Sequence, residues 1–311
     1  MGLAVLACVS SASFAGVSGY LDGQFHVDKN AADFRIYDGS VFASKELGNG
    51  LGYVNLPFSG GLATNSFSLA TVKAEAYASY KYDFGVKWTL GQFATPFGYE
   101  GNNTWGLRFS EYSLLKNAMP LTHTGFMAGY TSGSIEIKGL ISNPINKGTR
   151  VGTNFEAGGL VRYTHDALWV QGGFLGFSTG GEMQTLINAT FGGKWDKLGV
   201  DIDFLMTKLP VAGAETGIGF QGNLGYDINS SWAAGLRAEF LSKVANLYTT
   251  GALAALGITT GTVFAVTAGP QAKLTDDMKV KLDFTMMSSK ATSGASSTTS
   301  TMGTLAALYK F

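Results

Sequence analysis

The stretch Lys279-Val280-Lys281-Leu282-Asp283-Phe284-Thr285-Met286 decides the fold, because polar and apolar side chains alternate along it. Successive side chains of a β-strand point to opposite faces, so this stretch predicts a strand with one oily face and one charged face. The same alternation recurs along residues 16–311, in segments of roughly ten residues that Gly, Asn, Asp and Ser interrupt. No segment carries a convincing helical stripe, so the sequence predicts an all-β domain.

The composition excludes an ordinary soluble domain. Charged residues make up 14% of the 311 residues, against roughly 25% in typical soluble domains. The chain holds 43 glycines and only 6 prolines, and 13% of its residues are aromatic. With 22 basic and 22 acidic residues the net charge is zero, so no charge excess argues for a nucleic-acid partner.

Cysteine and histidine are too scarce for the common metal sites. Cys8 is the one cysteine, which excludes a disulfide within the chain and a metal site built from cysteines. The three histidines, His26, His123 and His165, are far apart in sequence, which argues against a histidine cluster. We therefore expect no metal and no cofactor.

The first residues predict an export signal. A short apolar core, Leu3–Val9, precedes Ser13-Phe14-Ala15, which supplies the small residues of a cleavage site. We expect residues 1–15 to be a signal peptide whose start is trimmed or misassigned, because the usual positive residues are missing before Leu3. Two alternatives remain open: the buried start of a strand or helix, and a lipid anchor on Cys8.

The connections favour a barrel that spans a membrane over a secreted sandwich. Tight turns tend to alternate with longer connections, as a barrel with short turns on one rim and long loops on the other requires. Tight turns are expected near Asp83, Ser132, Asp166, Asp196, Asn229 and Asp276. Rings with an oily body and a polar tip anchor a barrel at the lipid boundary, and those flanking the turns are Tyr82, Phe84, Tyr163, Trp169, Trp195, Tyr226 and Trp232. No later segment has the roughly 18 apolar residues of a membrane helix, and closure removes the strand edges that hydrocarbon disfavours.

The strand count is even if both ends of the domain lie on one rim, and the pattern permits two values. Fourteen segments alternate clearly, among them 16–27, 66–82, 198–208 and 278–290, and a further pair within 28–65 gives sixteen. With sixteen strands, residues 94–123 form the third external loop. The prediction is one transmembrane antiparallel up-and-down β-barrel over residues 16–311, with 16 strands or alternatively 14.

Three motifs and the C-terminus carry a family resemblance. The motifs are Gly19-Tyr20-Leu21-Asp22-Gly23, Gly91-Gln92-Phe93-Ala94-Thr95-Pro96-Phe97-Gly98-Tyr99-Glu100 and Pro120-Leu121-Thr122-His123-Thr124-Gly125, and the chain ends in Phe311. In these features the sequence resembles bacterial outer-membrane porins, and more narrowly the OmpL-like β-barrel porins. The resemblance covers the mature chain in outline, whereas motifs match only in its first third.

The resemblance implies a channel in the bacterial outer membrane for the passive diffusion of ions and small hydrophilic solutes. Loop 94–123 would fold into the pore, membrane lipid would surround the barrel, and the barrel assembly machinery would recognise Phe311. The alanine-rich outer face at 70–78 predicts an interface with two further copies of the chain in a trimer, and a lipid-facing strand is the alternative.

Charged side chains of the loop and wall are the candidate selective element, because charges that line a pore set the field through which solutes move. We expect Glu100 and Glu111 of the loop to face Lys73, Arg35 and Arg162 across the constriction. The same loop offers Arg108 and Lys116, and the wall also offers Lys81 and Lys87. The alternative is that each of these charges is merely a solvated residue of the lumen.

Two other classes of protein remain as rivals. A barrel hydrolase needs a positioned histidine with a carboxylate, and His26 with Asp22 on one strand face is the single plausible pair. Because this pair lies in the opening strand that carries the family resemblance, no catalytic residue is expected. A structural or adhesive barrel would bind partners with its external loops, and the Ser- and Thr-rich segment 288–300 indicates a mobile loop instead of a recognition surface.

Overall fold

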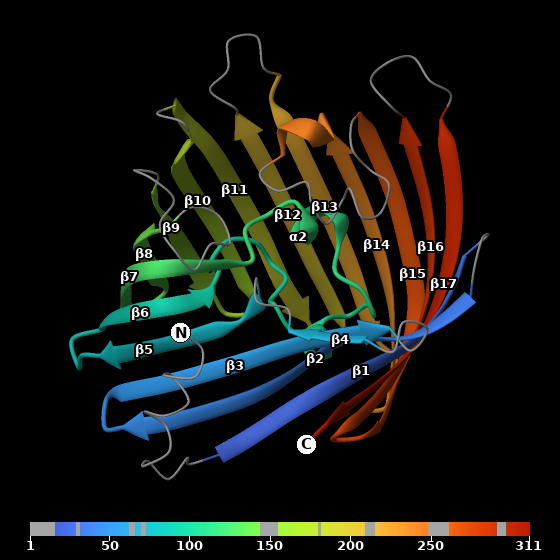
Figure 1. Ribbon diagram of the computed structural model, residues 1–311, viewed down its shortest axis with the longest axis horizontal. Coiled ribbons are helices and arrows are strands. Elements are labelled where there is room, and N and C mark those ends of the chain that lie inside the picture. Colours follow the sequence, from blue (N-terminus) through green and yellow to red (C-terminus); the bar gives the residue numbers. More distant parts are fainter. Residues whose placement is uncertain are drawn as a thin grey trace.

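The computed structural model describes residues 16–28, 32–61, 66–69, 73–143, 155–179, 182–208, 215–247, 261–290 and 297–311. The expected signal peptide, residues 1–15, lies outside these described residues. Figure 1 shows a wall of long strands that encloses a short helical segment. The strands are β1 (Gly16–Asp28), β2 (Ala32–Leu47), β3 (Gly50–Gly61), β4 (Ser66–Leu69), β5 (Glu75–Lys81), β6 (Val86–Ala94), β7 (Thr122–Ser132), β8 (Ile135–Ser142), β9 (Glu156–His165), β10 (Leu168–Thr179), β11 (Glu182–Trp195), β12 (Leu198–Lys208), β13 (Gly217–Asp227), β14 (Trp232–Ser242), β15 (Thr262–Thr275), β16 (Met278–Lys290) and β17 (Thr298–Lys310).

The strands form one closed antiparallel sheet whose order follows the chain. β4 and β5 lie one after the other along β3, where Phe58 pairs with Leu69 and Asn55 pairs with Glu75. The two short strands therefore share one position in the wall, and the barrel has sixteen positions. The prediction of sixteen strands instead of fourteen is confirmed.

The expected continuous strand 66–82 is wrong, because β4 and β5 pair with β3 in two different registers. Between the Phe58–Leu69 and Asn55–Glu75 pairs, β3 contributes two residues and the other chain five. One of the two on β3 is Pro57, which has no N–H to donate across the ladder. The ladder along β3 is therefore interrupted beside a proline.

The barrel closes where β1 pairs with β17, with Tyr20 opposite Lys310. Past the end of this ladder, the Gly19 N–H donates to the Phe311 carbonyl at 2.9 Å and the Phe311 N–H donates to the Gly19 carbonyl at 3.0 Å. A Cβ at position 19 would stand 2.5 Å from the Phe311 ring and from the Ser40 carbonyl oxygen. Only glycine fits at this seam, which agrees with its place in the opening motif.

Tight turns join the strands at the end of the barrel where Gly19 and Phe311 meet. In two of them an aspartate takes the left-handed backbone conformation, with φ of 48° at Asp166 and 51° at Asp196. Aspartate tolerates this region better than most residues, which is why it marks these turns in the sequence. The pairs His165–Leu168 and Trp195–Leu198 close the two hairpins as the turn prediction requires.

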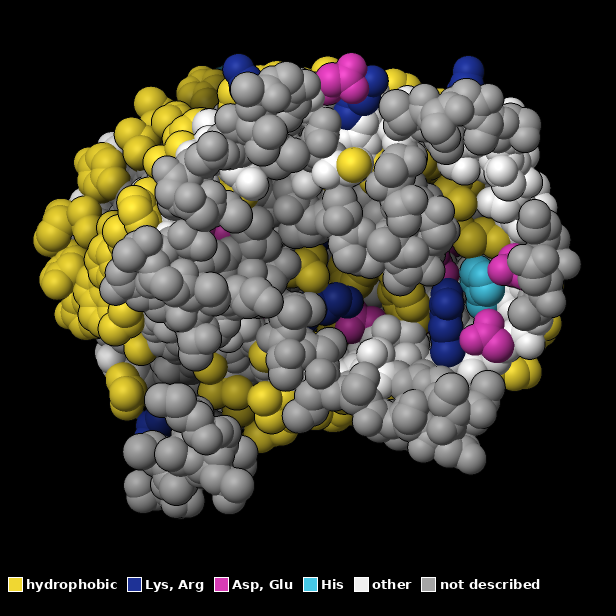
Figure 2. All heavy atoms as spheres, turned by 45° about the horizontal axis from the view of Figure 1, so that its top comes forward, with side chains coloured by type: hydrophobic (Ala, Val, Ile, Leu, Met, Phe, Trp, Pro, Cys, Tyr) yellow, Lys and Arg dark blue, Asp and Glu magenta, His cyan; other side chains and the backbone are white. Residues whose placement is uncertain are grey.

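The opening stretch of the sequence shows how the two faces of the wall differ. On β16 the outward Phe284 is 60% exposed, whereas the inward Lys281 and Asp283 are almost fully buried. Figure 2 shows hydrophobic side chains over the outer wall and charged side chains in the hollow inside it. Within the described ranges, no helix is long and apolar enough to cross a membrane.

The aromatic residues beside the tight turns point outward with one exception. Tyr163, Trp195, Tyr226 and Trp232 are each between 43% and 51% exposed on the outer face. Trp169 lies instead in the lumen under the guanidinium of Arg162, 4.0 Å from it. Its neighbour Val170 holds the outward position, so the expectation that Trp169 belongs to the outer girdle is wrong by one residue of phase.

Candidate functional site

The segment 95–121, between β6 and β7, folds into the lumen and is called the pore loop below. It contains the short helical turns η2 (Thr104–Gly106) and α2 (Leu114–Asn117), and α2 lies inside the wall in Figure 1. The loop is pinched at its base, where the Thr95 N–H and the Asn102 side chain both donate to the Leu121 carbonyl, at 3.0 and 2.7 Å. The Ser113 hydroxyl caps α2 by accepting from the Lys116 N–H at 2.9 Å.

One side of the pore loop packs on an apolar part of the inner wall. Leu115 and Met119 are buried against inward side chains of the strands from β8 to β15. These wall residues are Leu140, Leu160, Leu175, Phe177, Leu186, Leu205, Leu241, Val263 and Ala265. The inner face is therefore not uniformly polar, and the barrel has a hydrophobic core between loop and wall. The run 174–177, apolar on both strand faces, was the sequence signal for this core.

The other side of the pore loop is held by one lysine ammonium. Lys281 Nζ donates to the carbonyls of Thr104, Leu107 and Phe109 at 2.9, 2.8 and 3.0 Å. The adjacent inward residue, Asp283, accepts hydrogen bonds from both the N–H and the hydroxyl of Ser110. Segment 104–110 thus wraps round the ammonium, and its backbone carbonyls find a charged donor in place of water.

A buried histidine fixes the start and end of the pore loop to the wall. His123 Nε2 lies 3.1 Å from the Thr95 hydroxyl, and its Nδ1 lies 2.9 Å from Glu156 of β9. Ser142 of β8 also donates to Glu156, at 3.0 Å. His123 and Glu156 are fully buried, so these groups act as a clamp within the wall and not as a reaction centre open to solvent.

Glu111 and Arg35 meet directly between the pore loop and β2. His26 of β1 lies 3.7 Å from the same carboxylate oxygen of Glu111. Burial raises the pKa of Glu111, but the hydrogen bond from His26 and the positive charge of Arg35 outweigh it and lower that pKa overall. This group borders a cavity of about 500 Å³, which Tyr37, Tyr112 and Arg237 also line.

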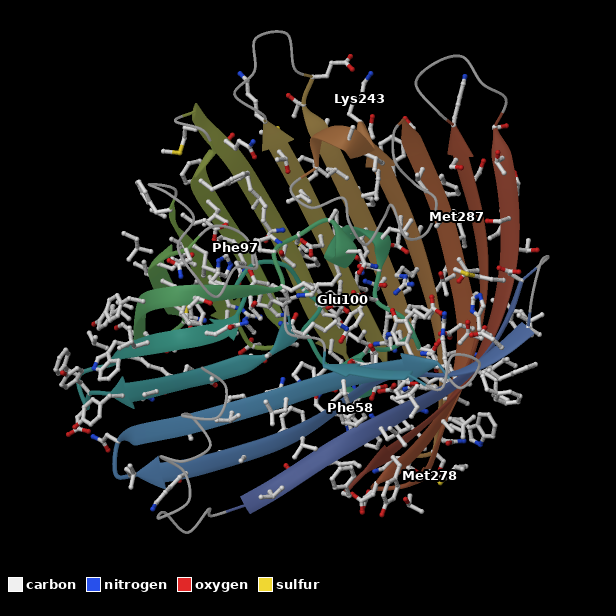
Figure 3. All side chains as sticks on the ribbon, in the orientation of Figure 1. Phe58, Phe97, Glu100, Lys243, Met278 and Met287 are labelled. Carbon is white, nitrogen blue, oxygen red and sulfur yellow. The ribbon has the colours of Figure 1, made fainter. Side chains whose placement is uncertain are left out.

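Glu100 lies inside the barrel near α2 (Figure 3) and contacts the wall at β13 and β14. One carboxylate oxygen accepts from the Ser113 N–H and hydroxyl, each at 2.9 Å. The other accepts from Gln221 at 3.2 Å and lies 3.5 Å from Arg237. Arg237 also contacts Glu239 at 3.0 Å, and Glu239 accepts from the Leu114 N–H at 2.6 Å.

The structure brings together only part of the expected set of facing charges. Arg35 lies against Glu111, but Lys73 lies 3.7 Å from Asp38 and 4.1 Å from the Tyr112 ring centre. Arg162 lies over Trp169, near the tight turn after β9. Glu100 and Glu111 contact other residues instead, Gln221 and Arg35. The alternation placed these side chains on the lumen face, whereas their partners depend on how the loop crosses the lumen.

Three residues of the site were not singled out from the sequence as candidates: Arg237, Glu239 and Asp38. Arg237 and Glu239 were visible as the inward charges of an alternating strand, and their position beside the loop is what the sequence did not reveal. Asp38 accepts from the hydroxyls of Tyr20 and Tyr112 at 2.6 and 2.8 Å. It lies within the register shift between Ile36 and Gly39, which hid its phase.

The remaining basic residues of the pore loop differ in environment. Lys116 of α2 is fully buried, and burial lowers its pKa to about 8 in spite of the nearby charges of Glu100 and Asp203. Arg108 is half-buried and lies on the inner wall over β12, β13 and β14. Lys81 and Lys87 belong to the wall, where they stand opposite each other in the ladder of β5 and β6, beside the tight turn at 82–85.

The hydrolase hypothesis finds no support in the surroundings of His26. Its Nδ1 lies 3.2 Å from the Thr304 hydroxyl and 3.4 Å from Arg35, and the contacting carboxylate is Glu111, not Asp22. Asp22 instead accepts from Gln24 at 3.3 Å. In the part of the chain that the structure describes, no group of three or more acidic, histidine or cysteine side chains could hold a metal ion.

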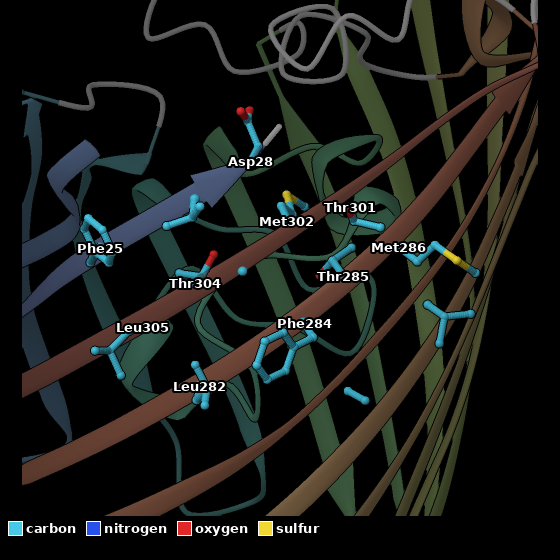
Figure 4. Close-up of a pocket in the computed structure, with 14 residues that line it drawn as sticks. Phe25, Asp28, Leu282, Phe284, Thr285, Met286, Thr301, Met302, Thr304 and Leu305 are labelled. Atoms are coloured by element: carbon cyan, nitrogen blue, oxygen red, sulfur yellow. The ribbon is translucent and has the colours of Figure 1, made fainter. Parts of the chain in front are cut away.

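A further hollow of about 920 Å³ lies on the outer face (Figure 4). Its lining includes the outward side chains Phe25, Leu282, Phe284 and Leu305, and Gly303 leaves room between them. These side chains belong to the apolar outer face of the wall, so this part of the hollow faces away from the lumen.

Comparisons with known proteins agree with this architecture. The sequence model of the family described as "Putative beta-barrel porin-2, OmpL-like" matches residues 15–311. Among solved structures, the anion-selective porin from Comamonas acidovorans has a TM-score of 0.67 at 13% identity, over 95% of this chain and 99% of that one. OmpF of Salmonella typhi, in complex with daunomycin, has a TM-score of 0.66 at 9% identity, over 95% and 97%. OmpT of Vibrio cholerae has a TM-score of 0.63 at 11% identity, over 95% and 97%. At these identities the likeness shows the fold alone, and no curated protein sequence matches the chain significantly.

Proposed function

Because the chain belongs to the OmpL-like family of β-barrel porins of the bacterial outer membrane, we propose that it forms a water-filled channel for ions and small hydrophilic solutes. Sixteen strands enclose a lumen too wide to be filled by the wall's own side chains. The pore loop crosses this lumen and narrows it. We propose that solutes cross the channel by passive diffusion, down their own concentration gradients.

The observation that carries the proposal is the contact of Glu111 with Arg35, because it sets opposite charges of loop and wall beside the open cavity. Glu100, Arg237 and Glu239 continue this band of charge towards β13 and β14. A solute that passes the band exchanges part of its hydration for these side chains, so their signs decide which ions pass easily. We name these five residues the constriction.

Planar bilayers test the proposal directly. The purified protein should give single-channel steps, and Glu100→Gln with Glu111→Gln should shift the reversal potential in a salt gradient away from cation preference. Asp277→Asn is the matched control, since Asp277 is an exposed turn residue. A folded wild-type protein without steps would favour a structural or adhesive barrel, and unchanged selectivity in the double variant would remove both glutamates from the constriction.

We infer that the barrel assembles as a trimer through the small outward side chains of β5. Ala76 and Ala78 are exposed on its outer face, where small residues allow close approach of a second subunit. Ala76→Cys should crosslink between subunits in native membranes, and Val170→Cys on the outer face of β10 should not. Monomers alone at both positions would exclude this interface.

Export and insertion complete the proposal. Residues 1–15 would direct export, and Phe311 would present the C-terminal signal that the barrel assembly machinery reads. Support comes from the exposed ring of Phe311, which stacks with that of Tyr309 at 6.4 Å while its backbone closes the seam.

A further inference from the structure

Three inward glycines stand side by side on neighbouring strands of the wall. Gly199 of β12 pairs with Gly225 of β13, and Gly225 pairs with Gly235 of β14. All three share the phase of the inward residues Asp201, Asn223 and Arg237 on their strands. The row therefore forms a shallow channel in the inner wall, called the glycine trough below.

The side chain of Arg108 fills the glycine trough. A Cβ at Gly235 would stand 2.7 Å from Arg108 Cδ, and one at Gly199 would stand 3.0 Å from Arg108 Nη2. A Cβ at Gly225 would overlap the guanidinium carbon itself. The side chain thus runs from β14 across β13 to β12, flat against bare backbone, where no other residue type would leave it room.

The shape of the glycine trough holds Arg108 in this position. Arg108 Nε is buried, and it finds no hydrogen-bond partner among the described residues. The charge of Arg108 interacts with the nearby Tyr99 and Asp201, and the three side chains line a cavity of about 230 Å³. Lys194 and Trp169 line the same cavity, at the end of the barrel that carries the tight turns.

We propose that the glycine trough is the seat of Arg108 and that, through it, Arg108 sets the width and ion preference of the pore at the tight-turn end. This inference rests on the proposed channel function. With Arg108 seated, its charge lies against the wall and the space beside it stays open. A methyl group in the trough would lift the guanidinium into the lumen, where it narrows the path and brings a positive charge nearer to passing ions.

The test is a double-variant comparison in planar bilayers. Gly225→Ala should lower the single-channel conductance and shift the reversal potential towards anion preference. Gly199→Ala should cause a smaller change in the same direction, because its methyl group would meet only the far end of the side chain. In an Arg108→Ala background, Gly225→Ala should cause no further change. Gly222→Ala is the control on the same strand, since its Cβ would lie at an ordinary 3.8 Å from the nearest ring atom, in Phe220.

The outcomes separate this inference from the channel proposal. If the wild-type protein conducts but a folded Gly225→Ala protein matches it in conductance and selectivity, the seat is overturned and the channel stands. The seat is also overturned if Gly225→Ala acts equally with and without Arg108, because the effect then arises from the sheet. If Gly225→Ala does not fold, Gly199→Ala alone and with Arg108→Ala gives the same comparison. Absence of conductance in the folded wild-type protein overturns both proposals.

Discussion

Lys281 is the residue on which the course of the pore loop most depends. Its ammonium satisfies three loop carbonyls and lies next to Asp283, which binds Ser110. The backbone of 104–110 bends round the Lys281 ammonium, which comes from β16 of the wall and not from the loop itself. Lys281, with Asp283 beside it, therefore shapes the seven residues 104–110 of the loop.

Lys281→Met should release segment 104–110 while the barrel stays folded. The methionine keeps the length of the side chain but leaves carbonyls without a donor, at a cost of roughly 1–3 kcal/mol for each one that stays buried. We expect faster proteolysis of the loop and noisier single-channel currents, and heat-resistant migration in detergent gels as for the wild type. Lys310→Met, at an exposed position of β17, should show neither effect. A quiet channel with a protected loop in Lys281→Met would contradict the anchoring role.

The contact between Glu111 and Arg35 should weaken only in acid. The pKa of Glu111 is lower than its ordinary value of 4.5, so its carboxylate stabilises the folded loop above pH 4.5 and loses this contribution as the pH falls through the lowered value. Conductance should therefore be steady from neutral pH to about 4.5 and change below it. Glu111→Gln should lack the acid transition, and its persistence in that variant would assign the transition to another group.

At the residue scale, alternation predicted which charges point inward but not which charges meet. Lys281 and Asp283 were correctly assigned to the inner face from the 279–286 pattern alone. Partners such as Glu100 with Arg237 connect residues more than a hundred positions apart through a loop without periodic pattern. Such pairs follow from the packing of the whole loop, which no local rule contains.

The helical turn α2 is the element that fixes the depth of the pore loop. Leu115 is fully buried, and a Cβ at Gly219 of β13 would overlap its side chain. The Glu239 carboxylate accepts from the first N–H groups of α2, those of Leu114 and Leu115, at 2.6 and 3.4 Å. Apolar packing and a charged acceptor thus hold four residues in one place.

Leu115→Ala should loosen the pore loop more than the barrel. Replacement of a buried leucine by alanine costs about 2–5 kcal/mol, and here the loss falls on docking of the loop because the strand ladders are untouched. Hydrogen exchange of 112–119 should speed up, whereas that of β12 and β13 should not. Leu305→Ala, on the outer face of β17, is the control. Equal protection of 112–119 in Leu115→Ala and the wild type would contradict this account.

At the element scale, the strands were largely predictable and their interruptions were not. The expected 198–208 and 278–290 coincide with β12 and β16, because strict alternation between tight turns leaves little freedom. The break between β4 and β5 escaped prediction because Pro57, which stands opposite it, lies on a different strand. The apolar inner patch was also missed, although the run 174–177, which is apolar on both strand faces, carried a signal for it.

For the whole molecule, the seam between β1 and β17 is the last contact that makes the wall continuous. Deletion of Phe311 removes the two hydrogen bonds with Gly19 and the ring that packs beside it. We expect a smaller folded fraction in heat-modified gel migration, since the end of the seam is then left unpaired in a membrane. Tyr309→Ala keeps both backbone bonds and should fold more completely than the deletion. Equal folding of the deletion and the wild type would show that closure does not depend on the last residue.

The pore loop touches the wall at widely separated strands, and this has a consequence for how the protein can evolve. Its backbone N–H groups donate to Asn188 and Asp203 on one side, and its carbonyls accept from Gln24 and Lys281 on the other. The loop thus crosses the lumen, and its contacts with Gln24 of β1 and Lys281 of β16 lie side by side only when the last strand pairs with the first. Permeability and assembly are consequently under joint selection. A change that loosens the pore loop to admit larger solutes also removes contacts that hold β1 and β16 together when the barrel closes.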